Sequence, residues 1–277
     1  MSLPRRLIVN ADDFGLSDSV NAAVIRAHRE GILTTASLMV NEPGTAAAVA
    51  LARENPRLGV GLHLTFLFGH SALPPERLPG LVNARGEFGE NPPSAGFRFF
   101  FDRRLRPQLR AELHAQFARF RATGLPLDHV NGHLHMHLHP VVFGLLMEDA
   151  AELGIARMRL TSDPLRVNLR AASGALGYRL SHALIFNCLA ARARPVLRRR
   201  GFAHTGAVFG LLQNARVDEA FVTRLLPLLP AGDSELYSHP SLDKFAHEFQ
   251  ALISPRVGGL IRELGIQLIT YRDLNPP

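Results

Sequence analysis

Two adjacent carboxylates, Asp12 and Asp13, follow the apolar run at residues 7–10 and precede Gly15. Two acids side by side repel each other, and burying them is unfavourable unless a proton, a cation or a metal lies between them. Their position at the end of an apolar run therefore makes the pair a candidate site. The alternative is a strand that ends in a solvated Asp-Asp turn.

Four histidines alternate with other residues at positions 133, 135, 137 and 139. If this segment is extended, all four imidazoles lie on one face, and a straight strand cannot bring all of them to one metal. One or two would then bind, while the others would form a second shell or contact substrate. If the segment is partly helical, His133 and His137 share a face and could both be ligands. The remaining interpretation is a group of packed or surface histidines without a metal.

This combination of residue types suits a hydrolytic metal site. Two imidazole nitrogens and one carboxylate, with positions left for water, fit zinc, magnesium, manganese, cobalt or iron. A second carboxylate outside the ligand set can accept the proton of the attacking water. His239, which precedes Pro240, could protonate a leaving group, or it could merely cap a strand end. The only cysteine is Cys188, which excludes a disulfide framework and a thiolate metal cluster.

Short apolar runs alternate with helical patterns along the chain, as in repeated β-α units on a parallel sheet. The candidate strands are residues 7–10, 37–40, 58–64, 127–131, 156–160, 207–211, 235–238 and 267–270. A count of about eight units predicts one closed, TIM-like β/α barrel over residues 1–277, with its site at the carboxyl ends of the strands. The polar residues at such ends are Asp12, Asp13, His63, the histidine tract, Arg159 and His239.

Helices are expected from Ser17 or Ser19 to Gly31, and over residues 46–54, 109–120, 141–153, 219–229, 245–253 and 257–264. Two insertions interrupt the repeat: an irregular one at about 66–107 and a mostly helical one at about 162–204. The first contains four phenylalanines, at positions 97, 99, 100 and 101. They predict either an apolar substrate groove or a small separate core beneath a loop.

Composition limits the choice of partners. The net charge of +7 comes from 31 basic and 24 acidic residues, but no basic-aromatic interleaving or reading module indicates nucleic acid. The arginines at 192, 194, 198, 199 and 200 could favour an anionic surface, although a solvated helix face explains them equally. No apolar run is long enough to span a bilayer and no signal core follows residues 1–6, so a soluble cytoplasmic protein is expected.

Four segments of the chain together resemble the YdjC-like carbohydrate deacetylases. They are residues 10–15 (NADDFG), 61–64 (GLHL), 131–137 (NGHLHMH) and 237–240 (YSHP), which occur in the family's order across nearly the whole chain. The resemblance implies a deacetylase with one divalent metal on a distorted barrel, with zinc or magnesium favoured. It makes Asp12 the base, Arg159 the residue that orients it, and His239 the acid. It makes Asp13, His63 and His133 the ligands, which leaves His135 and His137 as substrate or second-shell residues.

Two positions depart from the family pattern: Asn131 stands where many relatives have an acid, and Ser241 where they have glycine. Neither removes a proposed ligand, but both put substrate contacts in doubt. Residues 125–131, 137–140 and the phenylalanine-rich segment look most like the hopanoid-biosynthesis-associated branch, which implies an N-acetylglucosaminyl hopanoid as substrate. A peripheral membrane contact and a homodimer are further expectations. The alternatives are a metal-dependent phosphoesterase, and a non-catalytic glycolipid-binding protein with a structural metal.

Overall fold

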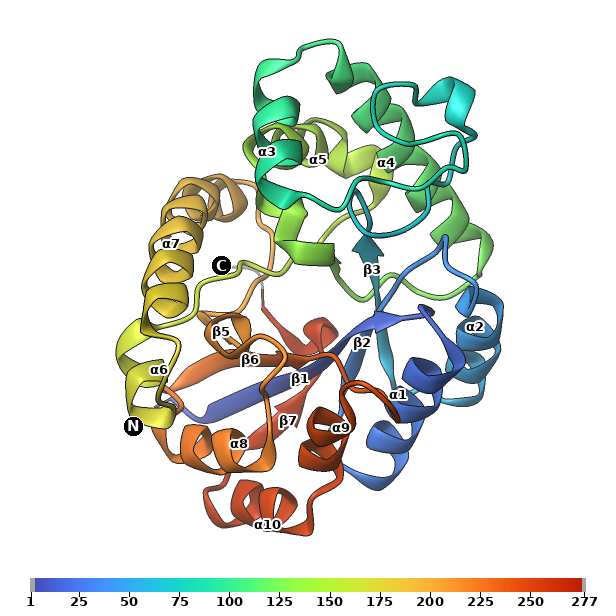
Figure 1. Cartoon of the computed structure of the whole chain (residues 1–277). Helices are drawn as coiled ribbons and strands as arrows, with labels where there is room; N and C mark the ends of the chain where they lie inside the picture. Colours follow the sequence, from blue (N-terminus) through green and yellow to red (C-terminus); the bar gives the residue numbers. More distant parts are fainter. Residues whose placement is uncertain (1–2, 276–277) are drawn as a thin grey trace.

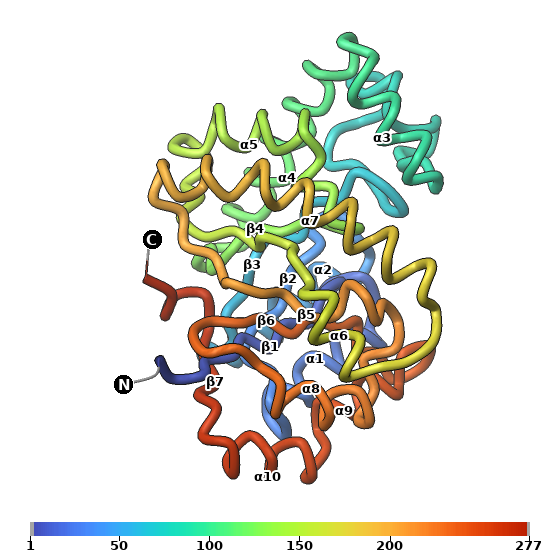
Figure 2. Tube along the Cα trace, turned by 90° about the vertical axis from the view of Figure 1, so that its left-hand side faces the viewer, coloured from blue at the N-terminus to red at the C-terminus, as the bar shows by residue number. Residues whose placement is uncertain are grey.

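Seven parallel strands form one curled sheet in the computed structural model, which describes residues 3–275. Helices surround the strands in two perpendicular views (Figures 1 and 2). The strands are β1 (Arg5–Phe14), β2 (Thr35–Leu38), β3 (Gly59–Leu64), β4 (Val130–Gly132), β5 (Ala207–Phe209), β6 (Gly232–Ser238) and β7 (Gln267–Ile269). The spatial order is β4-β3-β2-β1-β6-β5, and β7 pairs with the first half of β1.

The helices occupy the intervals between the strands, and short 3₁₀ turns follow several elements. The helices are α1 (Asp18–Glu30), α2 (Thr45–Glu54), α3 (Pro92–Phe101), α4 (Leu105–Ala122), α5 (Pro140–Leu153), α6 (Leu165–Ala171), α7 (Leu176–Arg199), α8 (Glu219–Leu225), α9 (Ala246–Ile253) and α10 (Pro255–Glu263). The 3₁₀ turns are η1 (Pro75–Arg77), η2 (His133–Leu138), η3 (Leu211–Gln213), η4 (Leu226–Leu228) and η5 (Tyr271–Asp273). Among the described residues, no helix is both long enough and apolar enough to cross a membrane.

Local chemistry explains where the helices begin and end. Ser17 caps α1 by accepting a hydrogen bond from the Val20 N–H, as expected from the sequence. Pro140 occupies the first turn of α5, where its missing N–H is not needed. Gly154 closes α5 in the left-handed conformation that glycine adopts without strain.

The predicted strand at residues 156–160 forms only isolated bridges. Met158 bridges Val130 of β4, and Arg157 bridges Ala203, which lies four residues before β5. This extended segment therefore joins the β4 edge of the sheet only by isolated bridges, and the regular strands within residues 3–275 number seven rather than the expected eight. Because the segment follows β4, it still brings Arg159 to the centre of the fold.

The region at about 66–107 is less irregular than expected. It contains α3, whose N-terminus is capped by Asn91, and two antiparallel bridges, His70–Glu87 and Val82–Phe88. Of the four phenylalanines, only Phe99 is buried, and it joins the main core instead of a separate one. The side chains of Phe97, Phe100 and Phe101 are exposed.

Candidate metal and acid-base site

Asp12 and Asp13 end β1 without forming the solvated turn that the sequence allowed. Both are buried, and the register between β1 and β2 shifts between Ala11 and Phe14. In a regular strand, neighbouring side chains point to opposite faces of the sheet. Asp13 instead has a φ of +64°, a left-handed conformation that redirects its carboxylate. The local distortion therefore lets Asp12 and Asp13 contact different partners at one end of the sheet.

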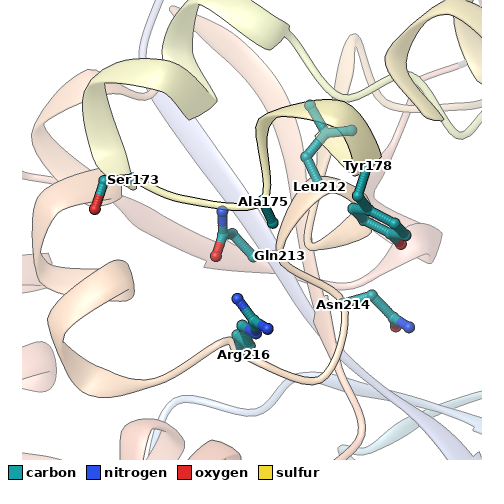
Figure 3. Close-up of a pocket in the computed structure, with 7 residues that line it drawn as sticks. All are labelled: Ser173, Ala175, Tyr178, Leu212, Gln213, Asn214 and Arg216. Atoms are coloured by element: carbon teal, nitrogen blue, oxygen red, sulfur yellow. The ribbon is translucent and has the colours of Figure 1, made fainter. Parts of the chain in front are cut away.

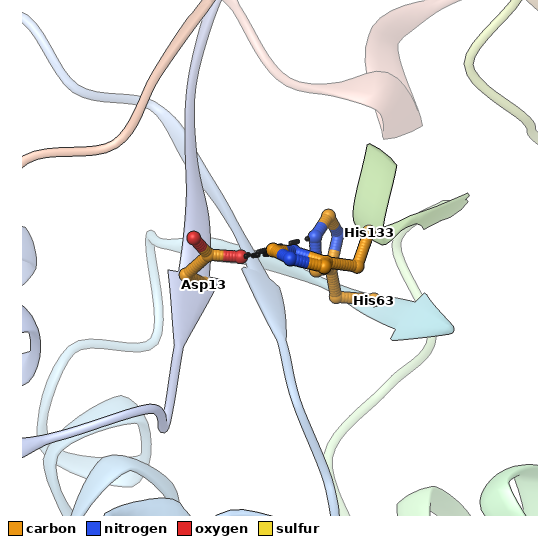
Figure 4. A group of neighbouring side chains, drawn as sticks. All are labelled: Asp13, His63 and His133. Atoms are coloured by element: carbon orange, nitrogen blue, oxygen red, sulfur yellow. Dashed lines mark hydrogen bonds and ion pairs between the residues drawn. The ribbon is translucent and has the colours of Figure 1, made fainter. Parts of the chain in front are cut away.

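Asp13 meets two histidines from neighbouring strand ends (Figure 4). Its Oδ1 atom lies 3.2 Å from Nε2 of His63 on β3 and 3.0 Å from Nδ1 of His133, directly after β4. Ligands about 2.1 Å from one cation lie about 3 Å apart when they are adjacent. One carboxylate oxygen and two imidazole nitrogens at these separations form a donor set that fits a divalent metal.

The electrostatics of these residues favour a positive charge between them. Burial alone would raise the pKa of Asp13, but His133 and the hydrogen bonds from both histidines hold it well below the ordinary value. Burial lowers the pKa of His133, yet the Asp13 carboxylate outweighs this effect and raises it. Either a proton on one of the histidines or a bound metal cation can supply that positive charge.

Asn131 fixes the orientation of His63. The His63 Nδ1–H donates to Asn131 Oδ1 at 2.7 Å, which leaves Nε2 free to face Asp13. The amide of Asn131 donates to Ser37 Oγ at 2.8 Å and to Asp12 Oδ1 at 3.3 Å. Asn131 is completely buried. Asn131 therefore supports the site from within the protein and is not part of its open surface.

Asp12 lies outside the three-residue cluster and is held by donors on several sides. Arg159 binds its two oxygens at 2.7 and 2.8 Å, and Asn10 Nδ2 donates at 2.8 Å. Burial would raise the pKa of Asp12, but the positive charge of Arg159 and its hydrogen bonds lower it below its ordinary value. Asp12 is thus ionised at neutral pH and can accept a proton.

Arg159 is buried between two acids. Glu235 on β6 accepts hydrogen bonds from Nε at 2.9 Å and Nη2 at 2.7 Å, and the ring of Tyr237 lies 4.5 Å from the guanidinium carbon. The side chain has no exposed surface. Arg159 is therefore held against Asp12, and it is too enclosed to contact a substrate directly.

The histidine tract adopts neither of the two regular conformations considered from the sequence. It forms η2, with Leu134 and His135 in left-handed conformations at φ of 50° and 57°. His135 lies 2.9 Å from the Tyr237 hydroxyl, and His137 Nε2–H donates to the Arg159 carbonyl at 3.0 Å. His137 is fully buried, and burial together with Arg159 lowers its pKa to about 3. His137 supports Arg159 and does not share a ligand face with His133.

His239 follows β6 and is partly exposed. A positive charge on His239 would lower the pKa of both Asp12 and Asp13. The His239 ring lies 5.7 Å from that of Tyr237, centroid to centroid. The structure therefore brings His239 to the same end of the sheet as the two aspartates.

Several supporting residues were not predicted from the sequence. Glu235 is an acid within a buried strand, and Glu248 is an acid on the buried face of α9. A charged residue in an apolar pattern signals a buried partner, but the sequence does not say which one.

A separate pocket of about 290 Å³ lies between the α6–α7 turn and the chain after β5. It is lined by Ser173, Ala175, Tyr178, Leu212, Gln213, Asn214 and Arg216 (Figure 3).

Comparison with known proteins identifies the family. Residues 6–263 match the family described as YdjC-like protein. The chain is 33% identical to the carbohydrate deacetylase of Geobacillus stearothermophilus over 98% of both chains. It is 31% identical to the chitooligosaccharide deacetylase of Serratia marcescens, over 98% of this chain and 100% of that one. A 147-residue stretch, covering 53% of this chain and 56% of the relative, is 40% identical to the carbohydrate deacetylase of Brevibacillus brevis.

A solved structure supports the fold. The crystal structure of a protein from Enterococcus faecalis V583, named as a candidate cellobiose-phosphate cleavage protein, superposes with a TM-score of 0.73. The two sequences are 22% identical, and the match covers 97% of this chain and 98% of the other. With the family match across residues 6–263 and full-length relatives above 30% identity, this chain belongs to the YdjC-like family.

Proposed function

We propose that this chain is a metal-dependent hydrolase that removes the acetyl group from an N-acetylated amino sugar. One observation carries the proposal: Asp13 faces His63 and His133, while the adjacent Asp12 is ionised and stands outside that cluster. This arrangement supports a cation site with a separate base, the two elements of metal-assisted amide hydrolysis. The names of the relatives in Geobacillus and Serratia supply the class of substrate.

Each residue then has a distinct task. Asp13, His63 and His133 would hold one divalent ion, with zinc or magnesium favoured over manganese, cobalt or iron. When bound, such an ion polarises an acyl oxygen and lowers the pKa of water. Asp12 accepts the proton of the attacking water, and Arg159 keeps its carboxylate in place. His239 donates a proton to the amine nitrogen as the C–N bond breaks.

The burial of Arg159 argues against the phosphoesterase alternative. That alternative needs Arg159 to stabilise charge on a phosphoryl group. The guanidinium is fully enclosed, and Asp12 and Glu235 already occupy its donors. Measuring acetate and phosphate release from acetylated and phosphorylated sugars separates the two reactions.

We further propose that the amino sugar is attached to a lipid, as in an N-acetylglucosaminyl hopanoid. Exposed apolar side chains support this substrate. Phe97, Phe100 and Phe101 on α3 are 67, 54 and 70% exposed, and Leu184 and Ile185 on α7 are 68 and 52% exposed. Large apolar side chains on a protein surface mark a site where a protein partner or a lipid surface binds and removes them from water. Both helices also approach the histidine tract, because Phe99 packs against His139 and Phe186 against His135.

The decisive experiment measures acetate release from N-acetylglucosaminyl hopanoid and from N-acetylated chitooligosaccharides in parallel, with metal-stripped and reconstituted protein. Activity on either substrate that requires the added metal supports the deacetylase. Absence of acetate from both substrates, with the metal bound, contradicts it. Activity confined to the oligosaccharides contradicts the lipid-linked substrate and leaves the deacetylase intact.

Membrane contact has its own test. The double variant Phe100→Ser and Phe101→Ser should reduce co-sedimentation with anionic phospholipid vesicles. Leu3→Ser is a matched control, because Leu3 is 70% exposed and lies at the opposite end of β1 from the site. Equal sedimentation of wild type and double variant would contradict a role for α3 in membrane contact.

A further inference from the structure

Glu248 is a buried acid that contacts His239. It lies on α9 and has no exposed surface. Its Oε2 atom accepts a hydrogen bond from the His239 backbone N–H at 2.6 Å and lies 3.8 Å from Nδ1 of the same residue. Its Oε1 atom accepts the Val217 N–H at 3.1 Å. One carboxylate therefore holds the backbone of His239 by a hydrogen bond and lies within ion-pair distance of one of its ring nitrogens.

The surroundings of Glu248 make this contact electrostatically important. Within residues 3–275, its only ion-pair partner is the His239 ring. Burying a carboxylate without a cation is unfavourable, so Glu248 stabilises an imidazole that presents an N–H to it. When Nδ1 faces Glu248, the opposite ring nitrogen, Nε2, is the one that remains available for proton transfer.

We propose that Glu248 is the positioning residue of His239 in proton donation to the leaving amine. This inference rests on the proposed function. In the step, the C–N bond breaks, its electron pair stays on nitrogen, and the Nε2 proton of His239 passes to that nitrogen. Glu248 keeps the Nδ1 side of the ring facing itself throughout, which fixes the ring orientation during the transfer.

A purely structural role is the competing explanation, because Glu248 also anchors the backbone of Val217. The chain before Val217 forms one wall of the pocket in Figure 3, through Gln213, Asn214 and Arg216. Losing that anchor would disturb the loop and lower activity without any effect on proton donation. The test must therefore report on the leaving group.

Two substrates with different leaving groups provide that readout. Release of an amine from an N-acetylated sugar needs a proton, whereas release of 4-nitrophenolate from 4-nitrophenyl acetate does not. Glu248→Gln keeps an oxygen that can accept a backbone N–H but removes the charge. It should lower kcat on the amide by about 10- to 100-fold, within the range of a general-acid contribution, and change the ester rate by no more than about threefold.

Glu112→Gln is the matched control. Glu112 is also fully buried, and it accepts the backbone N–H groups of Ala72 and Leu73, at 2.7 and 3.0 Å. Its substitution should leave the ratio of amide to ester rates unchanged. In a His239→Ala background, Glu248→Gln should have no additional effect on that ratio, because the residue it positions is gone.

Equal losses on amide and ester, or an unchanged amide rate, would overturn the positioning role. If Glu248→Gln does not fold, Glu248→Asp replaces it, and the shortened carboxylate should lower the amide-to-ester ratio by a smaller factor. An unchanged ratio in that variant would equally overturn the proposal. Failure of the proposed function looks different, since the wild type would then release no acetate from any N-acetylated sugar.

Discussion

Asp12→Asn separates the proposed base from the metal ligands. The substitution keeps the shape of the side chain, but an amide cannot accept a proton from water. General-base catalysis typically contributes 10²- to 10⁴-fold, so we expect kcat for acetate release to fall by about that factor. Asp12 is not one of the three residues of the proposed metal site, Asp13, His63 and His133. The affinity for the metal should therefore change by less than about tenfold.

The same substitution should also destabilise the fold. Asp12 and Arg159 are both almost fully buried, and removing one partner from such a pair typically costs about 3–5 kcal/mol. Arg159 keeps Glu235 as a second acid, which places the expected loss toward the lower end of that range. Urea unfolding at pH 7 measures the stability, and metal content and acetate release are measured on the folded fraction.

Glu235→Gln is the control for this structural effect. It removes the other acid from Arg159, with the same burial, and leaves the bidentate contact to Asp12 in place. We expect a similar loss of stability with a much smaller loss of kcat. If Asp12→Asn lost its metal, Asp12 would be a ligand. If it turned over at the wild-type rate, the assignment of the base would be refuted.

Other predictions follow from the cluster and from Asp163, a buried acid that accepts the Leu212 N–H beside the pocket in Figure 3. His63→Ala should abolish stoichiometric zinc binding in calorimetry. His114→Ala, in a second group of possible ligands on α4 and α5, should leave that binding in place. Equal zinc affinity in the two variants would contradict the assignment of His63 as a ligand. Asn131→Ala should weaken metal binding by about 10- to 100-fold, because His63 loses its acceptor, and unchanged affinity would contradict that support. Burial raises the pKa of Asp163 from 3.8 to about 7. The folded protein therefore keeps a proton that the unfolded chain releases, and stability falls as the pH rises from about 4 to 7. Asp163→Asn should weaken this dependence of stability on pH and raise the unfolding free energy above pH 7 by up to about 4 kcal/mol. Urea unfolding at pH 5 and pH 8 measures both effects. The same change in unfolding free energy between the two pH values in wild type and variant would contradict this prediction.

The sequence predicted which strand ends would meet, because parallel strands place their carboxyl ends at one edge. Asp13, His63 and His133 come from three different elements, and their positions at the ends of apolar runs placed them in one larger group with Asp12, Arg159 and His239. The choice of these three as ligands came from the resemblance to the YdjC-like family. The helix termini at Ser17 and Gly154 also followed from local chemistry. Features that depend on residues adjacent in the sequence, such as these helix ends, were therefore predicted from the sequence.

Features set by distant contacts could not be predicted. The left-handed conformation of Asp13 separates the roles of two adjacent acids, and no residue type in that segment requires it. The conformation of the histidine tract depends on left-handed Leu134 and His135, for which glycine would have been the expected signal. Residues 156–160 have the composition of a strand, but they form bridges instead of a regular ladder. In these three cases, contacts with residues distant in the sequence determine the backbone conformation and override the local preference of the residue types.

The pairing of β1 has a consequence for biosynthesis. The strand that carries Asp12 and Asp13 is made first, but Arg5 pairs opposite Gly232 and Ile8 opposite Ile269. At a synthesis rate of about 5–20 residues per second, β1 waits roughly 10–45 s for β6 to emerge from the ribosome. During that time the exposed strand edge can pair wrongly or recruit a chaperone. The aspartates are thus translated long before the strands that complete their surroundings.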